Sequence, residues 1–164
     1  GNFGEISGLG AILDWGASFS SRPVALKGWY DYSPVAINRT KAPYDNLKGQ
    51  TDKCQLMVLL TDWPEQFEIN TTDGKFVDFD NDPNIIGFGR YQSDVTTGGY
   101  EEFVIPIEYR NSRTPKYIVI VAASSYLGDY FTGGEGSTLY VDEFSFEYDV
   151  TKLTDEQKAN VNYR

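Results

Sequence analysis

The sequence predicts an all-β fold, an antiparallel β-sandwich of the jelly-roll type, and three observations predict it. Aromatic residues make up 15% of the 164 residues, and they include 12 tyrosines, 10 phenylalanines and 3 tryptophans. The 16 glycines and 7 prolines punctuate short apolar segments, as turns between strands require. Several of these segments alternate apolar and polar residues, which is the period of a strand with one buried face. We assign residues 1–150 to one sandwich domain and residues 151–164 to a polar tail with a short helix.

The segment 24–32 shows how this alternation assigns the two faces of a strand. Tyr30 and Tyr32 continue the apolar parity of the segment, so they are predicted to point into the core. Trp29 has the opposite parity, so its indole is predicted to point outward. Residues 11–19 alternate in the same way and are predicted to form one strand.

Four further segments complete the predicted sandwich. Residues 54–60 and 117–121 are apolar at both parities, which is typical of central strands covered on both faces. Residues 102–109 alternate, and Pro106 within them requires a sheet edge or a bulge because proline has no N–H to donate. In the last strand the apolar parity changes, so a β-bulge at Asp142–Glu143 is predicted to restore one apolar face.

Two local motifs predict a turn and a helix start. In residues 67–79, a three-residue turn at 73–75 would bring the apolar residues of both arms to one face of a hairpin. In the tail, Thr154 is followed three residues later by Gln157, the pattern of a capping box.

Charge and composition exclude several function classes. The net charge of −10 would repel a phosphate backbone, so nucleic acid is not expected as a partner. The chain has no histidine, which removes the usual general base and most zinc sites. The single cysteine, Cys54, lies in an apolar run and is predicted to be a small buried hydrophobe. No apolar stretch approaches the length of about 20 residues that a membrane span needs.

Two acidic segments are candidate metal sites. Asp142 lies in a YVDEF segment that resembles the calcium-binding final strand of many sugar-binding jelly rolls. No cofactor is predicted apart from this candidate structural calcium. A second set offers the hard oxygen ligands that calcium prefers, although such residues also satisfy their own backbone in acidic turns: Asp78, Asp80, Asn81, Asp82 and Asn84.

Flat aromatic rings away from the core are candidate sugar-binding groups. The C–H face of a pyranose stacks on such rings, and neighbouring polar groups can bind the hydroxyls. On this reasoning the predicted carbohydrate-binding residues are Trp29, Trp63, Tyr91, Tyr126 and Asp129. The alternative explanation for each ring is that a small sandwich cannot bury all of its aromatic residues.

Two blocks of the sequence resemble the putative carbohydrate metabolism domain family. The first block comprises Trp15, Gly16, Phe19, Arg22, Pro23, Gly28, Tyr30 and Tyr32. The second comprises Ser124, Ser125, Gly128, Asp129, Phe131, Gly133, Gly134, Gly136, Ser137, Leu139, Val141 and Asp142. We expect the three glycines from Gly133 to Gly136 to adopt positive φ, and Asp129 to tie their loop through backbone N–H groups.

The resemblance implies a jelly roll similar to carbohydrate-binding modules, with its first strand and a preceding N-terminal domain absent here. It also implies an extracytoplasmic address, at the bacterial cell surface or in the periplasm, with a lipid anchor in the full-length protein. The leading prediction is a non-catalytic domain that binds a glycan. One alternative is a structural or protein-interaction sandwich. The other is a glycoside hydrolase with paired carboxylates, for which the candidate pairs are Glu101/Glu102, Asp62/Glu65 and Asp142/Glu143.

Overall fold

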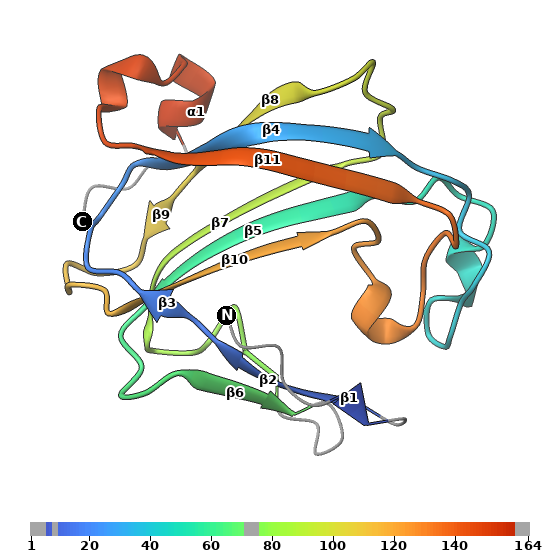
Figure 1. Cartoon of the computed structure of the whole chain (residues 1–164), viewed down its shortest axis with the longest axis horizontal. Helices are drawn as coiled ribbons and strands as arrows, with labels where there is room; N and C mark the ends of the chain where they lie inside the picture. Colours follow the sequence, from blue (N-terminus) through green and yellow to red (C-terminus); the bar gives the residue numbers. More distant parts are fainter. Residues whose placement is uncertain (1–5, 8–9, 71–75, 160–164) are drawn as a thin grey trace.

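The fold is an antiparallel β-sandwich, which confirms the predicted class (Figure 1). The structure is a computed structural model, and it describes residues 6–7, 10–70 and 76–159. A five-stranded sheet has the order β3-β10-β5-β7-β9 and faces a three-stranded sheet with the order β11-β4-β8. A second three-stranded sheet, β1-β2-β6, lies beside the sandwich.

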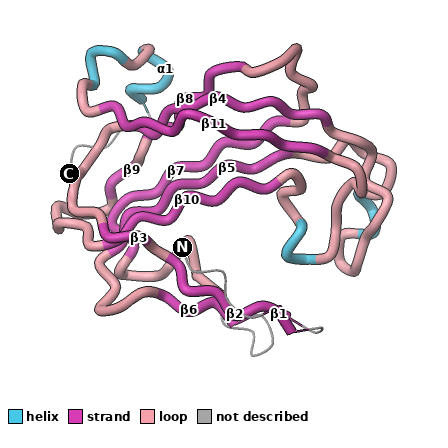
Figure 2. The backbone as a smooth tube through the Cα atoms, in the orientation of Figure 1, coloured by secondary structure: helices cyan, strands magenta, loops and turns pink. Residues whose placement is uncertain are grey.

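The strands are short and are joined by loops and single turns of 3₁₀-helix (Figure 2). In chain order the strands are β1 (Ile6–Ser7), β2 (Gly10–Trp15), β3 (Ala17–Ser18), β4 (Ala25–Ser33), β5 (Cys54–Thr61), β6 (Phe67–Asn70), β7 (Ile85–Ser93), β8 (Glu101–Pro106), β9 (Glu108–Tyr109), β10 (Tyr117–Ala123) and β11 (Thr138–Glu147). The helical segments are η1 (Asp45–Leu47), η2 (Gly128–Tyr130), η3 (Val150–Lys152) and α1 (Asp155–Ala159). Within the described residues, none of the helices has the length and hydropathy needed to cross a membrane.

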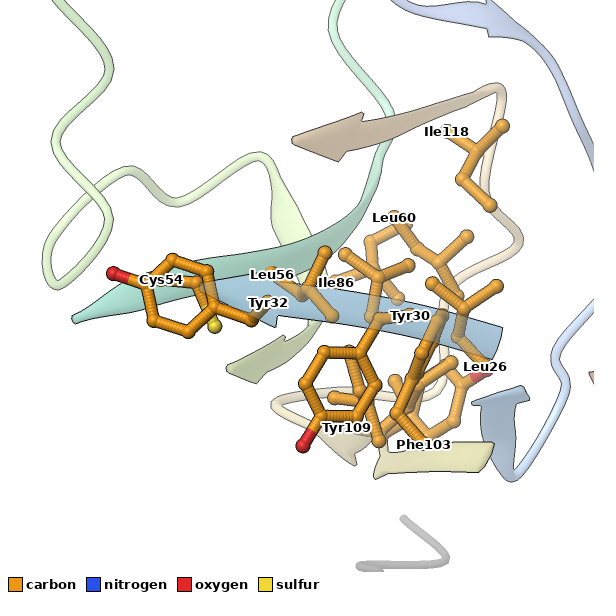
Figure 3. Close-up of a cluster of buried hydrophobic side chains, with 13 residues drawn as sticks. Leu26, Tyr30, Tyr32, Cys54, Leu56, Leu60, Ile86, Phe103, Tyr109 and Ile118 are labelled. Atoms are coloured by element: carbon orange, nitrogen blue, oxygen red, sulfur yellow. The ribbon is translucent and has the colours of Figure 1, made fainter. Parts of the chain in front are cut away.

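The core between the two large sheets follows the alternation of β4. Leu26, Tyr30 and Tyr32 point inward and are at most 4% exposed, whereas Trp29 points outward and is 39% exposed. The inward side chains meet those of β5, β7 and β8 in one continuous cluster (Figure 3). Each fully buried aliphatic side chain of this kind stabilises the fold by about 1.5–3 kcal/mol. The predicted orientation of the two tyrosines and of the tryptophan is therefore confirmed.

The central strand β5 is covered on both faces, as the doubly apolar pattern predicts. Leu56 and Leu60 point into the core between the sheets. Met57 and Leu59 point to the opposite face of the sheet, where Trp63 packs over them in a second cluster. Strand β10 lies beside β5 and contributes to both clusters in the same way.

Two segments predicted as single strands are each divided between two sheets. Residues 11–19 are interrupted at Gly16, whose φ of 115° breaks the extended backbone between β2 and β3. Residues 102–109 divide at Ile107, with β8 in the three-stranded sheet and β9 in the five-stranded sheet. Pro106 ends β8, an edge strand, in agreement with the prediction. The two breaks let the chain pass from one layer to another.

The predicted bulge in β11 is confirmed. The pairing with β4 shifts between Asp142 and Ser145, so two residues of β11 lie opposite Gly28. Phe146 beyond the bulge packs against the core together with residues that precede the bulge. Phe144, which lies directly after Asp142–Glu143, is 43% exposed, and its ring lies 5.9 Å from that of the core residue Phe103.

The hairpin predicted for residues 67–79 does not form as expected. Strand β6 pairs with β2, and residues 76–79 form no strand; the predicted turn at 73–75 lies outside the described residues. The capping box is confirmed, because Thr154 Oγ1 accepts from Gln157 N at 3.2 Å. In return, Thr154 N donates to Gln157 Oε1 at 2.9 Å and starts α1.

The buried tyrosines predict loss of stability in alkali. Burial raises the pKa of Tyr30, Tyr32 and Tyr109 well above the ordinary value of 10.0. The folded state then holds these protons more tightly than the unfolded chain, so the stabilisation is complete below pH 10 and is lost as the pH rises above it. We expect the urea midpoint to fall steadily between about pH 10 and pH 12.

Tyr109→Phe should make this pH dependence less steep, because one of the three buried phenols is removed. The comparison uses the slope of the urea midpoint against pH, since the variant also loses the hydrogen bond from Tyr109 to the carbonyl of Pro23. A wild-type midpoint that stays constant up to pH 12 would contradict the prediction.

Candidate functional site

An open hollow lies at one end of the sandwich, where the loops 34–53 and 124–137 meet. This end carries the 3₁₀ turns η1 and η2 and is on the right in Figure 1. The hollow has a volume of about 550 Å³, and we call it the loop-end cleft. Its lining includes Asn38, Arg39, Lys48, Phe131 and Glu135.

The floor of the loop-end cleft is organised by Asp52, which is completely buried. Its Oδ2 accepts hydrogen bonds from Ser125 Oγ at 2.5 Å, Gly134 N at 2.8 Å and Ser137 Oγ at 3.0 Å. Its Oδ1 accepts from the backbone N–H of Lys53 at 2.8 Å. The Asp52 carboxylate therefore joins the start of β5 to both ends of the loop 124–137, which we call the glycine-rich loop.

Two glycines of this loop are required by space rather than by backbone conformation. A Cβ at Gly133 would lie 2.7 Å from Ser125 Oγ, and a Cβ at Gly134 would lie 2.8 Å from the carbonyl oxygen of Val35. Only Gly136 has the expected positive φ, at 110°. The prediction of positive φ at all three glycines is therefore wrong for the first two, which let the loop approach its neighbours closely.

Phe131 is an exposed ring on an unusual backbone. Its φ of 54° and ψ of 30° are left-handed, and its side chain is 73% exposed. The loop fixes this conformation, because Phe131 N donates to Gly128 O at 3.0 Å and the next residue, Thr132, is only 1% exposed. Non-glycine residues rarely adopt left-handed backbone, and such positions cluster at ligand sites.

The two loops that form the loop-end cleft carry further aromatic and charged groups. Tyr130 is 56% exposed, and its ring lies 5.3 Å from that of Tyr44 in the facing loop. Arg39 Nε and Glu135 Oε2 form an ion pair at 2.7 Å between the two loops. The Arg39 guanidinium lowers the pKa of the Glu135 carboxyl, so this group is ionised at neutral pH.

The predicted site residues fall in several places, and two of them lie on the loop that forms the cleft. Tyr126 is half-buried, with Lys53 Nζ 5.6 Å from the centre of its ring. Asp129 lies in η2, directly before the exposed aromatic pair Tyr130 and Phe131. Asp129 is exposed, and no hydrogen bond of its carboxylate to a described residue is found, so the expectation that it ties the loop is wrong. Asp52 has that role.

The remaining predicted aromatics lie away from the loop-end cleft. Trp29 is on the outer face of the three-stranded sheet, between Asp142 on β11 and Glu102 on β8. Tyr91 is partly buried, and its hydroxyl lies 2.9 Å from that of Tyr30.

The expectation that Trp63 is accessible at a strand end is wrong, because its side chain is 3% exposed. Its ring centre lies 4.9 Å from that of Phe67, and its Nε1 donates to Asp82 Oδ2 at 2.9 Å. The outer face of β5 is apolar and needs a cover, which this ring supplies. We therefore leave Trp63 out of the candidate site.

The acidic segment 78–84 forms a turn that uses its own oxygens. The Asp78 carboxylate accepts hydrogen bonds from the side-chain amide and the backbone N–H of Asn81 and from the backbone N–H of Asp80, and these bonds lower the pKa of Asp78. Asp142 Oδ1 likewise accepts from Glu143 N at 2.8 Å. In the described part of the chain no three acidic or cysteine side chains gather in a metal-binding group. Calcium at Asp142 stays a prediction.

Sequence reasoning missed Asp52 and did not single out Phe131 as a ligand group. Asp52 lies in the polar stretch TDK, which has no periodicity that would indicate burial. Phe131 was visible only as a position of the family motif. The sequence signal for this site is the pair Ser125 and Ser137 together with the glycines between them. The hydroxyl and backbone N–H groups of such a tight loop need a common hydrogen-bond acceptor.

Comparisons with known proteins place the chain among carbohydrate-related domains. The family model described as putative carbohydrate metabolism domain matches residues 1–147, which confirms the predicted resemblance. No curated protein matches the sequence.

Two similar solved structures are crystal structures of putative glycoside hydrolases. The one from Bacteroides thetaiotaomicron has a TM-score of 0.65 and 24% identity, with 84% of this chain covered. The one from Bacteroides vulgatus has a TM-score of 0.63 and 17% identity, with 83% of this chain covered. The match spans only 41% and 56% of those two chains, respectively. At these identities the likeness shows a shared fold.

Proposed function

Because the chain belongs to the putative carbohydrate metabolism domain family, we propose that it is a non-catalytic glycan-binding domain whose site is the loop-end cleft. The observation that carries the proposal is the exposed ring of Phe131, held by left-handed backbone at the edge of the hollow. Its 73% exposed side chain offers apolar area that the fold itself does not bury.

The chemistry of the cleft suits a saccharide. The C–H face of a sugar ring would stack on Phe131, and Asn38, Arg39 and Glu135 would offer planar polar groups to its hydroxyls. The Asp52 network fixes the loop before ligand arrives, which reduces the entropy lost on binding. The hollow is open, so we expect micromolar to millimolar dissociation constants, as for other shallow sites.

Binding is favoured over hydrolysis by the state of the carboxylates at the cleft. A glycosidase needs one carboxyl that keeps its proton near neutral pH to protonate the leaving oxygen. Glu135 is exposed, and the Arg39 guanidinium lowers the pKa of its carboxyl further below the ordinary value, which is the opposite of what a general acid needs. Asp52 is buried under the floor, with both oxygens occupied by hydrogen bonds. Neither arrangement favours a general acid.

The cellular setting is part of the same proposal. We propose that the domain lies outside the cytoplasm, at the cell surface or in the periplasm, within a lipid-anchored protein. Calcium, if bound at Asp142, would stabilise β11 at the bulge and would not touch the saccharide in the loop-end cleft.

Two matched variants test where the glycan binds. A glycan array with the wild-type protein identifies a ligand, and calorimetry then compares Phe131→Ala with Trp29→Ala. Both side chains are exposed, so neither change should lower the melting temperature by more than a few degrees. We expect Phe131→Ala to weaken binding at least about tenfold, or ~1.4 kcal/mol, and Trp29→Ala to leave it unchanged.

The reverse result has a definite meaning. Loss of binding in Trp29→Ala alone would move the site to the outer face of the three-stranded sheet, where Trp29 lies between Glu102 and Asp142. An array with no retained glycan would remove the proposal. Release of reducing sugar from a bound oligosaccharide would show that the domain is a hydrolase.

A further inference from the structure

We propose that the ligand of the loop-end cleft is an acidic saccharide, one that carries carboxylate or sulfate groups; this inference rests on the proposed function. The first observation is a local reversal of charge. The chain has 24 acidic and 14 basic residues and a net charge of −10. The lining of the cleft nevertheless contains Arg39 and Lys48 but only one exposed carboxylate, Glu135.

A third cation lies beside the exposed ring. Lys41 Nζ is 4.9 Å from the centre of the Phe131 ring, a distance at which a cation is attracted by the aromatic face. Lys41 N also donates to the Oγ1 of buried Thr132, so the backbone of Lys41 is fixed beside the ring. A sugar stacked on Phe131 would therefore lie within reach of an ammonium group.

The ion pairs of the protein leave these lysines available. The described pairs join Arg39 to Glu135, Arg113 to Asp62, Lys152 to Glu147, and Lys158 to Asp155. Neither Lys41 nor Lys48 has a carboxylate partner among the described residues. One exposed ammonium group in the lining of the cleft, that of Lys48, and a second beside the Phe131 ring, that of Lys41, favour a ligand that brings its own negative charge.

Arg39 can serve the same anion. Its described hydrogen bond to Glu135 uses Nε at 2.7 Å, which leaves the terminal nitrogens for a carboxylate or sulfate. Glu135 stands where a ligand anion would approach, so it competes for the guanidinium. This competition predicts that neutralising Glu135 strengthens binding of an acidic saccharide, whereas neutralising the lysines weakens it.

The experiment compares matched saccharides on the wild-type protein. The probes are galacturonate oligosaccharides, the same oligosaccharides with reduced carboxyl groups, and sulfated heparin oligosaccharides, each titrated by calorimetry. We expect at least tenfold tighter binding of an acidic probe than of the carboxyl-reduced one. Binding of the uronate assigns the carboxylate as the recognised group, and binding of heparin alone shows that a sulfated saccharide is recognised in place of the galacturonate.

Charge variants provide the second arm. The double change Lys41→Gln and Lys48→Gln should weaken binding of the acidic probe about tenfold or more, whereas Glu135→Gln should strengthen it several-fold. Lys116→Gln is the matched control, because Lys116 is also exposed but precedes β10 at the other end of the sandwich, and it should bind as wild type does.

The two proposals fail in different ways. Equal affinity for the acidic and carboxyl-reduced probes would overturn the acidic ligand and leave glycan binding standing. An acidic probe that binds the double lysine variant as tightly as wild type would also overturn it. Absence of binding by every saccharide, on the array and in solution, would overturn glycan binding itself.

Discussion

Replacing Asp52 with alanine is expected to destabilise the domain by about 3 kcal/mol, a large fraction of the stability of a single domain. The change leaves the backbone N–H groups of Lys53 and Gly134 without their acceptor, at a position where the Asp52 side chain is completely buried. Each unsatisfied buried donor costs about 1–3 kcal/mol. Urea unfolding at pH 7, followed by fluorescence, measures the difference.

Two controls separate this network from the general cost of removing an acid. Asp45→Ala removes an exposed carboxylate from the facing loop and should change the free energy of unfolding by less than about 0.5 kcal/mol. Asp52→Asn keeps the shape but turns an NH₂ group toward one set of donors, so its loss should be intermediate. A stability of Asp52→Ala within error of wild type would show that the loop closes without this carboxylate.

Most of the fold was predictable because the core obeys the two-residue period. Tyr30, Tyr32 and Trp29 point as the alternation indicates, and the doubly apolar run of β5 is buried on both faces. The bulge in β11 was predictable for the same reason, since a change of apolar parity within one strand needs an extra residue.

The wrong predictions about the fold concern features that the local sequence pattern does not encode, such as pairing between distant segments. The apolar and polar residues alternate through Gly16 although the strand breaks there. The break comes from the positive φ of Gly16, and alternation of side chains carries no information about φ. The arm Phe67–Asn70 pairs with β2, more than 50 residues earlier in the chain, and no turn signal marks that contact. Trp63 lies beside a proline in a polar segment, yet it covers the open face of β5.

The candidate site was less predictable than the fold. Its organising group is one buried carboxylate, and burial of a single acid cannot be read from composition when 24 acids are present. The exposed ring at its edge depends on a left-handed residue directly after a 3₁₀ turn, which residue spacing does not reveal. Tyr126 and Asp129, which were predicted from the sequence, lie on the same loop as Phe131, and Asp129 belongs to the same family motif.

Replacing Gly89 with alanine is expected to destabilise the sandwich by about 3 kcal/mol through overpacking. Gly89 lies in β7 and pairs with Val58 of β5. A Cβ at this position would be 2.7 Å from the carbonyl oxygen of Pro106 and 2.8 Å from Ile105 Cγ2. The backbone oxygen cannot rotate away, because β8 is held by its pairing with β4. The two sheets would have to separate locally.

Gly98→Ala is the matched control for this change, because a Cβ at that exposed position meets no atom within 4 Å. It should leave the free energy of unfolding unchanged or raise it slightly, since alanine restricts the unfolded chain. Both variants are compared by urea unfolding, and the comparison tests the distance between the layers directly. If Gly89→Ala were as stable as Gly98→Ala, β7 and β8 would have to lie farther apart than the structure places them.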